Sequence, residues 1–148
     1  MTKIFLKQSD QKNIAYISYE KKKLKCIVGK NGIGQKTREG DFVTPKGIFK
    51  LGKVFFRSDR IKKIKSGLPT IKIEKNFVWC VDPKRVEYNK LIKKPANCFY
   101  EDLHRMDSLY DIIVTINYNL HPIRKYIGSA IFIHCSEEKG CHTAGCVA

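Results

Sequence analysis

Apolar and polar residues alternate along much of this chain in short runs rich in β-branched and aromatic side chains. Alternation with a period of two places the apolar side chains on one face of an extended segment, so these runs predict half-buried β-strands. The predicted strands cover residues 3–7, 14–19, 24–29, 48–56, 77–81, 111–118 and 129–135. The runs at 111–118 and 129–135 are the most continuously apolar, which predicts a central place in a sheet.

Segments without this alternation separate the predicted strands. Residues 29–41 carry four glycines and predict a loop, and Pro45 and Gly47 predict a turn in the stretch TPKGIF. Helical patterning is confined to the short segments 89–94 and 101–111, which lie within a long middle connection, residues 82–110. Long connections often line functional sites. The pattern predicts one mostly β domain, a sandwich or an open barrel, over residues 1–148.

Composition adds a strong positive charge to this picture. Apolar residues make up 43% of the chain and charged residues 29%, which is typical of a globular protein. The 29 Lys and Arg against 14 Asp and Glu give a net charge of +15, which favours association with anionic polymers, nucleic acid or anionic membrane faces. The simpler interpretation is a general enrichment in solvated lysines. No apolar stretch is long enough to predict a transmembrane helix, and residues 1–12 lack the pattern of a signal peptide.

Two further chemistries are weakly indicated. Six cysteines without framework-like spacing predict free thiols in a reducing compartment, with an oxidised pair as the alternative. The glycine loop contains Gly32-Ile33-Gly34, but a third glycine, a following amphipathic helix and a Lys-Ser/Thr pair are missing. The loop therefore does not predict nucleotide binding.

The last fifteen residues, HCSEEKGCHTAGCVA, hold three of the six cysteines and two of the four histidines. A zinc site is one hypothesis for this cluster, since thiolates and imidazoles are the preferred ligands of zinc. None of the candidate ligands forms a Cys-x-x-Cys pair, and the intervals match no familiar zinc motif. The candidates are His134, Cys135, Cys141, His142 and Cys146.

A thiol nucleophile with its base is the second hypothesis for the cluster. Gly145 precedes Cys146 and allows a backbone conformation in which the amides around the cysteine converge on a developing oxyanion. His134 ends the apolar run 129–134, so a strand end is predicted to hold the imidazole. The eleven residues between His134 and Cys146 suffice to return the chain and bring base and thiol together.

At these residues the chain resembles the L,D-transpeptidase catalytic domain family (YkuD-like). The family's mark is a histidine at a strand end followed, after a loop, by Ser or Thr, a variable residue, Gly and Cys. Here these are His134 and then Thr143, Ala144, Gly145 and Cys146. The ending TAGCVA is similar to one branch of the family. The stretches TPKGIF, WCVDP, RMDSLYDIIVTINYN and GSAIFIH follow in the family's order, so the resemblance covers most of residues 28–148.

The resemblance implies a β-sandwich-like catalytic fold and acyl transfer on bacterial peptidoglycan stem peptides. Cys146 would attack a carbonyl, typically that of meso-diaminopimelate, and expel the terminal D-alanine through an acyl-thioester. His134 would act as the base, amides near Gly145 and Cys146 would hold the oxyanion, and Thr143 would support the turn or orient His134. The acceptor would be an amine or water. The resemblance implies no metal and no cofactor, a monomer, and no nucleic-acid partner.

Two features depart from the family's usual pattern. Members usually continue beyond the cysteine with a short helix and a strand, so we expect this chain to be truncated at its C-terminus, with Cys146 on a fraying end. The family implies a periplasmic or cell-envelope location, whereas the N-terminus predicts no export, which leaves a cytoplasmic location as the alternative. The rival functions are a non-catalytic basic module that binds anionic glycan or nucleic acid, and a small zinc protein.

Overall fold

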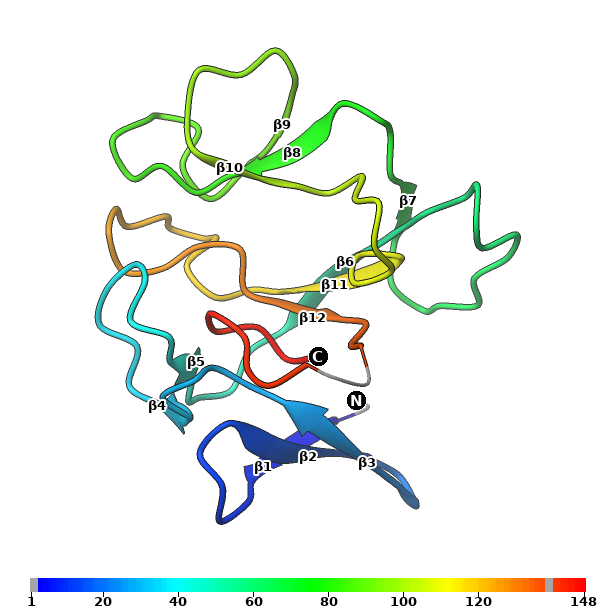
Figure 1. Ribbon diagram of the computed structural model, residues 1–148, viewed down its shortest axis with the longest axis vertical. Coiled ribbons are helices and arrows are strands. Elements are labelled where there is room, and N and C mark those ends of the chain that lie inside the picture. Colours follow the sequence, from blue (N-terminus) through cyan, green and yellow to red (C-terminus); the bar gives the residue numbers. More distant parts are fainter. Residues whose placement is uncertain (1–2, 138–139) are drawn as a thin grey trace.

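The computed structural model describes residues 3–137 and 140–148, and these residues form twelve strands and no helix. The strands build three small sheets that are stacked as layers along the longest axis of the molecule (Figure 1). A fourth, two-stranded parallel pair joins β4 (Ile33–Gly34) to β5 (Thr44–Pro45) beside the lower two layers. The predicted mostly β fold is thereby confirmed. Because the described residues contain no helix, they contain no helix that spans a membrane.

The first layer is an antiparallel meander of β1 (Phe5–Gln8), β2 (Ile14–Tyr19) and β3 (Lys22–Ile27). Its inner face buries Ala15 and Cys26, which are direct partners across β2 and β3. Its outer face carries the side chains that alternate with the inward-facing ones along each strand. The sequence therefore predicted these three strands to within a few residues.

The middle layer has the strand order β12-β11-β6-β7. Its strands are β6 (Leu51–Phe56), β7 (Thr70–Lys72), β11 (Ile112–Ile116) and β12 (Phe132–His134). The central position predicted for residues 111–118 is confirmed, because β11 pairs with β12 on one side and with β6 on the other. The same prediction for residues 129–135 is wrong, because β12 is the outermost strand of this sheet and meets the terminal segment through an isolated bridge from Ile133 to Val147.

The third layer has the strand order β10-β8-β9, in which β8 (Phe77–Cys80) is fully buried. Its outer strands are β9 (Leu91–Lys93) and β10 (Tyr100–Asp102). β9 lies in the predicted helix 89–94, and β10 takes up the start of the predicted helix 101–111, which continues in bends and turns, so both helix predictions are wrong. Pro95 closes the first segment and disfavours helical dihedrals in the residue before it. Pairing with the buried strand β8 then outweighs the weak helical propensity of short segments.

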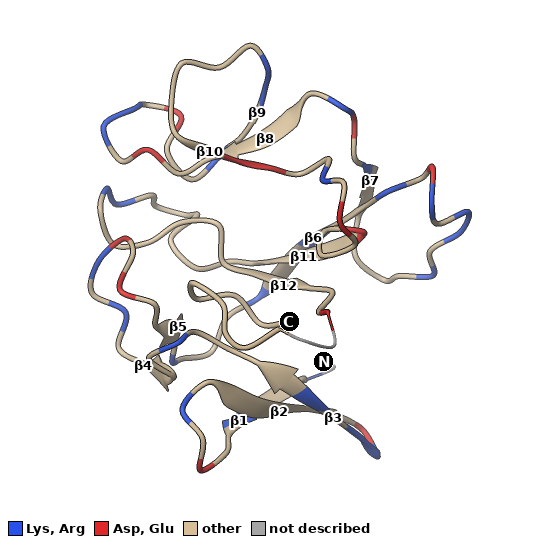
Figure 2. Cartoon of the chain, viewed as in Figure 1, with Lys and Arg blue, Asp and Glu red and all other residues tan. Residues whose placement is uncertain are grey.

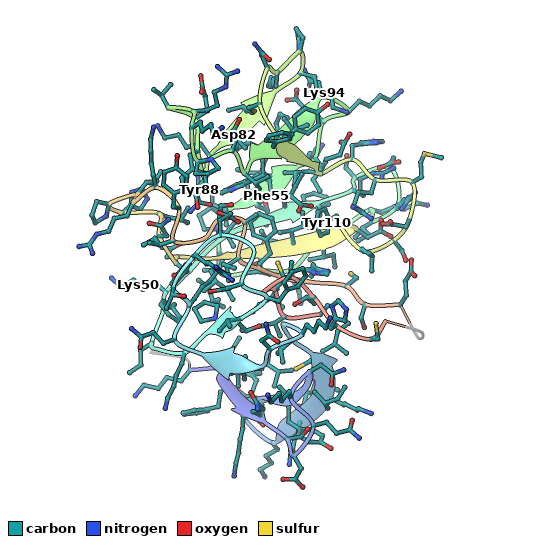
Figure 3. All side chains as sticks on the ribbon, turned by 60° about the vertical axis from the view of Figure 1, so that its left-hand side comes forward. Lys50, Phe55, Asp82, Tyr88, Lys94 and Tyr110 are labelled. Atoms are coloured by element: carbon teal, nitrogen blue, oxygen red, sulfur yellow. The ribbon has the colours of Figure 1, made fainter. Side chains whose placement is uncertain are left out.

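Two cores separate the layers. The larger lies between the middle and third layers and contains Phe55, Trp79, Phe132 and Tyr110, whose rings meet edge to face at centroid distances of 5.1–6.3 Å. Figure 3 shows Phe55 and Tyr110 in the interior and Lys50 and Lys94 at the periphery. The smaller core lies beneath β12, where Val28 and Val147 are fully or almost fully buried. Lys and Arg residues occur in all three layers of the chain and are not confined to one (Figure 2).

The last described residues form a short parallel connection between the first and middle layers. Val147 N–H donates to Phe132 O, and Val147 O accepts from His134 N–H, each at 2.9 Å. On the other side Ala148 exchanges two backbone hydrogen bonds with Ile27, at 2.7 and 2.9 Å. The expectation that Cys146 lies on a fraying, unsupported end is therefore wrong, because hydrogen bonds on both sides hold the segment.

Candidate active site

His134 and Cys146 lie on neighbouring segments, at the junction of the middle layer and the terminal segment. His134 is the last residue of β12, as its position after the apolar run predicted. Cys146 and Val147 continue beside β12, with Val147 pointing to the smaller core and Cys146 to the larger one. The side chains of His134 and Cys146 both line one cavity of about 320 Å³. The two residues that the sequence singled out as base and nucleophile therefore line the same cavity.

A tight turn holds the backbone of Cys146. The Thr143 hydroxyl accepts a hydrogen bond from Gly145 N–H at 3.1 Å and donates one to Cys146 O at 2.7 Å. Gly145 has a φ of +147°, and a Cβ built there would lie 3.0 Å from Val43 O. Glycine is therefore required by both backbone conformation and space. No backbone hydrogen bond in the described part of the chain uses the N–H of Cys146, which leaves this donor free at the cavity.

The Cys146 thiol is a neutral, buried group in this resting arrangement. It donates to Ala130 O at 3.1 Å and accepts from Phe132 N–H at 3.4 Å. Burial raises the pKa of the thiol to about 12, and the Phe132 amide only partly opposes this shift. Near pH 7 the nucleophilic thiolate is therefore scarce until a base removes the proton.

The His134 imidazole is oriented from two sides. Its Nδ1 lies 2.7 Å from Cys135 O, which fixes the proton on Nδ1 and leaves Nε2 as the basic nitrogen. The Tyr110 ring meets the imidazole edge to face at a centroid distance of 5.1 Å. Burial lowers the pKa of His134, and hydrogen bonds to the carbonyls of Cys135 and Leu109 oppose that shift. A neutral imidazole at pH 7 can accept a proton.

Tyr110 is a site residue that the sequence pattern did not single out. It lines the cavity, is 8% exposed, and donates its hydroxyl to Glu101 at 3.3 Å. Burial raises the pKa of Tyr110 strongly, so the phenol stays protonated. Two signals in the sequence pointed to it: the long connection 82–110, which contains Tyr110 and Glu101, and the stretch RMDSLYDIIVTINYN, and in the structure Glu101 and Tyr110 line the cavity.

Two arginines fix the loop that presents Tyr110. The Arg57 side chain is almost fully buried, and its guanidinium donates to Arg105 O and binds Asp59. Arg60 donates to Asp107 O and Asp111 at 2.7 Å each. These hydrogen bonds attach residues 105–111 to the end of β6, so the position of Tyr110 beside His134 is set by the middle layer.

A buried ion pair supports the glycine turn from below. Lys36 and Asp41 lie 2.5 Å apart with side chains 2% and 9% exposed, and Lys36 also donates to Val43 O at 3.3 Å. Burial alone would raise the pKa of Asp41, but the hydrogen bonds from Lys36 and from loop amides lower it overall. Removing one partner of such a pair leaves a buried charge without its counterion, which is strongly destabilising.

The cavity itself is acidic, in contrast to the net charge of the chain. Its described lining includes the carboxylates of Glu39, Glu101 and Glu137 and one ammonium, that of Lys36. Glu39 is held in place, because its carboxylate accepts hydrogen bonds from the hydroxyls of Tyr88 and Ser129. A ligand with an ammonium group therefore fits this cavity better than a purely anionic one.

The remaining members of the terminal cluster make other contacts, although His142 also lines the cavity. All six cysteines are free thiols, and Cys141 is exposed. Cys135 points to Ile112 O at 4.0 Å, and His142 lies on the cavity rim with its ring edge to face with Phe42. Among the residues that the structure describes, no three His, Cys, Asp or Glu side chains converge as a metal-ion site.

The raised pKa predicts how Cys146 reacts with iodoacetamide. Since only the thiolate is alkylated, the labelling rate of Cys146 should rise about tenfold per pH unit from pH 7 to 10 without a plateau. Peptide mass spectrometry after timed labelling measures this rate, and exposed Cys141 in the same digest serves as an internal control that is labelled first at pH 7. A plateau below pH 9 would show instead that a thiolate exists in the resting protein.

Comparison with known proteins agrees with this geometry. The family model of the L,D-transpeptidase catalytic domain (YkuD) matches residues 3–148, so the chain belongs to that family of cysteine acyltransferases. Members of the family typically act in the cell envelope on peptidoglycan stem peptides. No curated protein and no solved structure gives a significant match to the chain.

Proposed function

We propose that this protein is an L,D-transpeptidase that transfers the acyl part of a peptidoglycan stem peptide through a thioester on Cys146. The observation that supports the proposal is the shared cavity, which the side chains of Cys146 and His134 both line beside a glycine turn. Membership of the family supports the same reaction class. The required chemistry needs no metal and no cofactor, because the chain supplies nucleophile, base and oxyanion donors.

The first half-reaction forms the thioester. When the substrate carbonyl enters the cavity, the Cys146 thiol exchanges its hydrogen bond to Ala130 O for one to Nε2 of His134 and loses its proton there. The thiolate attacks the carbonyl carbon, typically that of meso-diaminopimelate, and the free N–H of Cys146 stabilises the oxyanion. Collapse breaks the amide bond, and the imidazolium returns its proton to the departing amine of D-alanine.

The second half-reaction releases the acyl group. An amine or a water molecule attacks the thioester carbonyl while neutral His134 removes its proton. The Cys146 thiolate then leaves and takes the proton back from His134. An amine acceptor gives cross-linking or amino-acid exchange, and water gives carboxypeptidase activity. The fixed carboxylate of Glu39 and that of Glu101 favour substrates with a free ammonium group, as diaminopimelate has.

The cellular setting follows from the substrate. We place the protein in the periplasm or cell envelope, where stem peptides are cross-linked, with the cytoplasm as the alternative location for action on recycled muropeptides. Residues 1–148 act as one catalytic domain, and we expect it to work as a monomer, since base and nucleophile come from the same chain.

A carbapenem tests the proposal, because its strained carbonyl acylates the thiol nucleophile of such an enzyme. After incubation, intact-mass spectrometry should show wild-type protein heavier by one carbapenem molecule, while Cys146→Ala keeps its own mass. Cys141→Ala, which removes an exposed thiol, is the matched control and should acylate like wild type. An unmodified wild-type protein, or the same adduct on Cys146→Ala, would exclude Cys146 as the nucleophile.

A further inference from the structure

The outer face of the first layer is a charged surface that acyl transfer does not use. Cross-strand partners point to the same side of a sheet, so the registers define which residues share this face. One row is Lys7, Tyr16 and Lys25, and the next is Phe5, Ser18 and Lys23. The three lysines and Phe5 are exposed, and the opposite face buries Ala15 and Cys26 in the smaller core.

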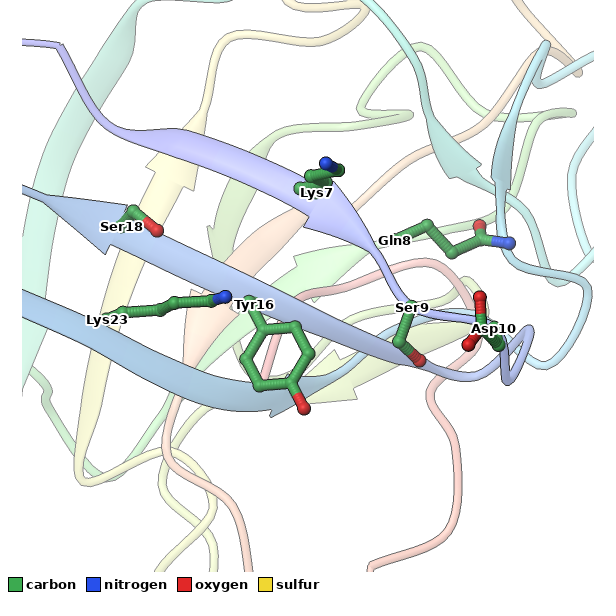
Figure 4. Close-up of a pocket in the computed structure, with 7 residues that line it drawn as sticks. All are labelled: Lys7, Gln8, Ser9, Asp10, Tyr16, Ser18 and Lys23. Carbon is green, nitrogen blue, oxygen red and sulfur yellow. The ribbon is translucent and has the colours of Figure 1, made fainter.

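Side chains of these two rows line a common hollow on the surface of the sheet. Lys7, Tyr16, Ser18 and Lys23 line a hollow of about 380 Å³, closed at one end by Ser9 and Asp10 (Figure 4). The Lys23 ammonium lies 4.5 Å from the centre of the Tyr16 ring, which holds the ring against the sheet. Gln8 anchors the floor, because its side-chain oxygen accepts a hydrogen bond from Ile33 N–H in the glycine loop.

The lysines of this surface are free to bind an external anion. Within the described residues, the ion pairs use Lys36, Lys93 and Lys94 among the lysines, and none uses Lys7, Lys23 or Lys25. Unpaired ammonium groups beside the Ser18 hydroxyl attract the carboxylates of an anionic polymer and can donate hydrogen bonds to it.

The chemistry of the hollow favours a glycan with carboxylates over a nucleic acid. All cations around it are lysines, and arginine, the side chain whose planar fork matches phosphate, is absent from its lining. Asp10 at its end would repel the closely spaced phosphates of a nucleic acid. The carboxylates on a peptidoglycan strand are separated by whole sugars and peptides, so they can reach the lysines without lying beside Asp10.

We propose, resting on the proposed function, that the concave outer face of β1–β3 is a docking surface that holds a peptidoglycan strand by its carboxylates while the cavity at Cys146 acts on its stem peptides. The surface supplies affinity for the polymer, and Cys146 supplies the chemistry. Docking does not require the thiol, so a Cys146→Ala protein should bind peptidoglycan as tightly as wild type. This separates the docking proposal from the proposed reaction.

Co-sedimentation of the full chain with purified peptidoglycan sacculi tests the docking surface. Lys7→Glu combined with Lys23→Glu should weaken binding at low salt by about tenfold or more, because it replaces two attractive charges with repulsive ones. The matched control is Lys62→Glu with Lys63→Glu, two exposed lysines outside the described ion pairs, which changes the net charge equally and should alter binding less than about threefold. The milder pair Lys7→Gln and Lys23→Gln should give an intermediate loss.

Three further measurements complete the test. Release of D-alanine from a soluble muropeptide should be unchanged in the Lys7/Lys23 variant, which also shows that it folds. Sacculi whose carboxylates have been amidated should bind wild type several-fold more weakly. Equal losses in the two charge-reversal pairs would overturn the proposal, and so would tighter binding of single-stranded DNA than of sacculi through the same two lysines.

Discussion

Replacement of Cys146 by alanine is expected to abolish acyl transfer, with kcat/KM for D-alanine release lowered by at least about 10⁴-fold. Among the described residues that line the cavity, Cys146 carries the one thiol, and neither the Glu39 nor the Glu101 carboxylate can form the thioester intermediate. The measurement is D-alanine release from a soluble stem tetrapeptide, followed by mass spectrometry of the muropeptide products.

The Cys146→Ala variant should remain folded, so its inactivity can be assigned to chemistry. The side chain is small, and its loss from the larger core should lower the free energy of unfolding by about 1–2 kcal/mol. Thermal unfolding checks this, and Cys141→Ala, in which an exposed thiol is removed, should keep both stability and rate. Residual turnover above one per cent in Cys146→Ala would contradict nucleophilic catalysis by this thiol.

Replacement of His134 by alanine should lower kcat/KM by about 10²–10⁴-fold, because the thiol then loses its base. The Cys146 thiol, with a pKa of about 12, is rarely ionised at neutral pH. The residual rate of His134→Ala should therefore rise steadily with pH. In wild type, burial lowers the pKa of His134 below its ordinary value of 6.5. The neutral, active form therefore already predominates at pH 6.5, and wild-type activity should fall only at pH values below 6.5.

Tyr110 offers a control for this second prediction. Tyr110→Phe keeps the ring that meets the imidazole edge to face at 5.1 Å and should retain most of the activity, whereas Tyr110→Ala removes it and should shift the acid limb of the pH profile as well as the rate. The pH–rate profiles of wild type, Tyr110→Phe and His134→Ala provide the comparison. An unchanged acid limb in His134→Ala would show that another group is the base.

Predictions from the sequence were most accurate where one face of a strand is buried. Residues 14–19 alternate clearly, and the strand has the same bounds in the structure. Predictions were poorest in the connection 82–110, where segments of a few residues carry little local preference. There Leu91–Lys93 and Tyr100–Asp102 became strands because β8 offered backbone partners on both sides. Such long-range pairing leaves no periodic signal in the short segment that it captures.

For the candidate site too, the sequence indicated some features and left others to the tertiary structure. The order of residues His134, Thr143, Gly145 and Cys146 is a local pattern, because a strand end and a glycine turn are written in adjacent residues, and this pattern indicated base and nucleophile without a structure.

Only the tertiary structure decided how the two residues are surrounded. It placed the thiol in a core that raises its pKa, set Tyr110 against the imidazole from 24 positions away, and lined a cavity with carboxylates in a chain of net charge +15. It also paired Ala148 with Ile27, so that both neighbouring layers support the nucleophile. These features depend on burial and on contacts between distant segments. Neither can be predicted from the amino-acid composition or from the spacing of residues in the sequence.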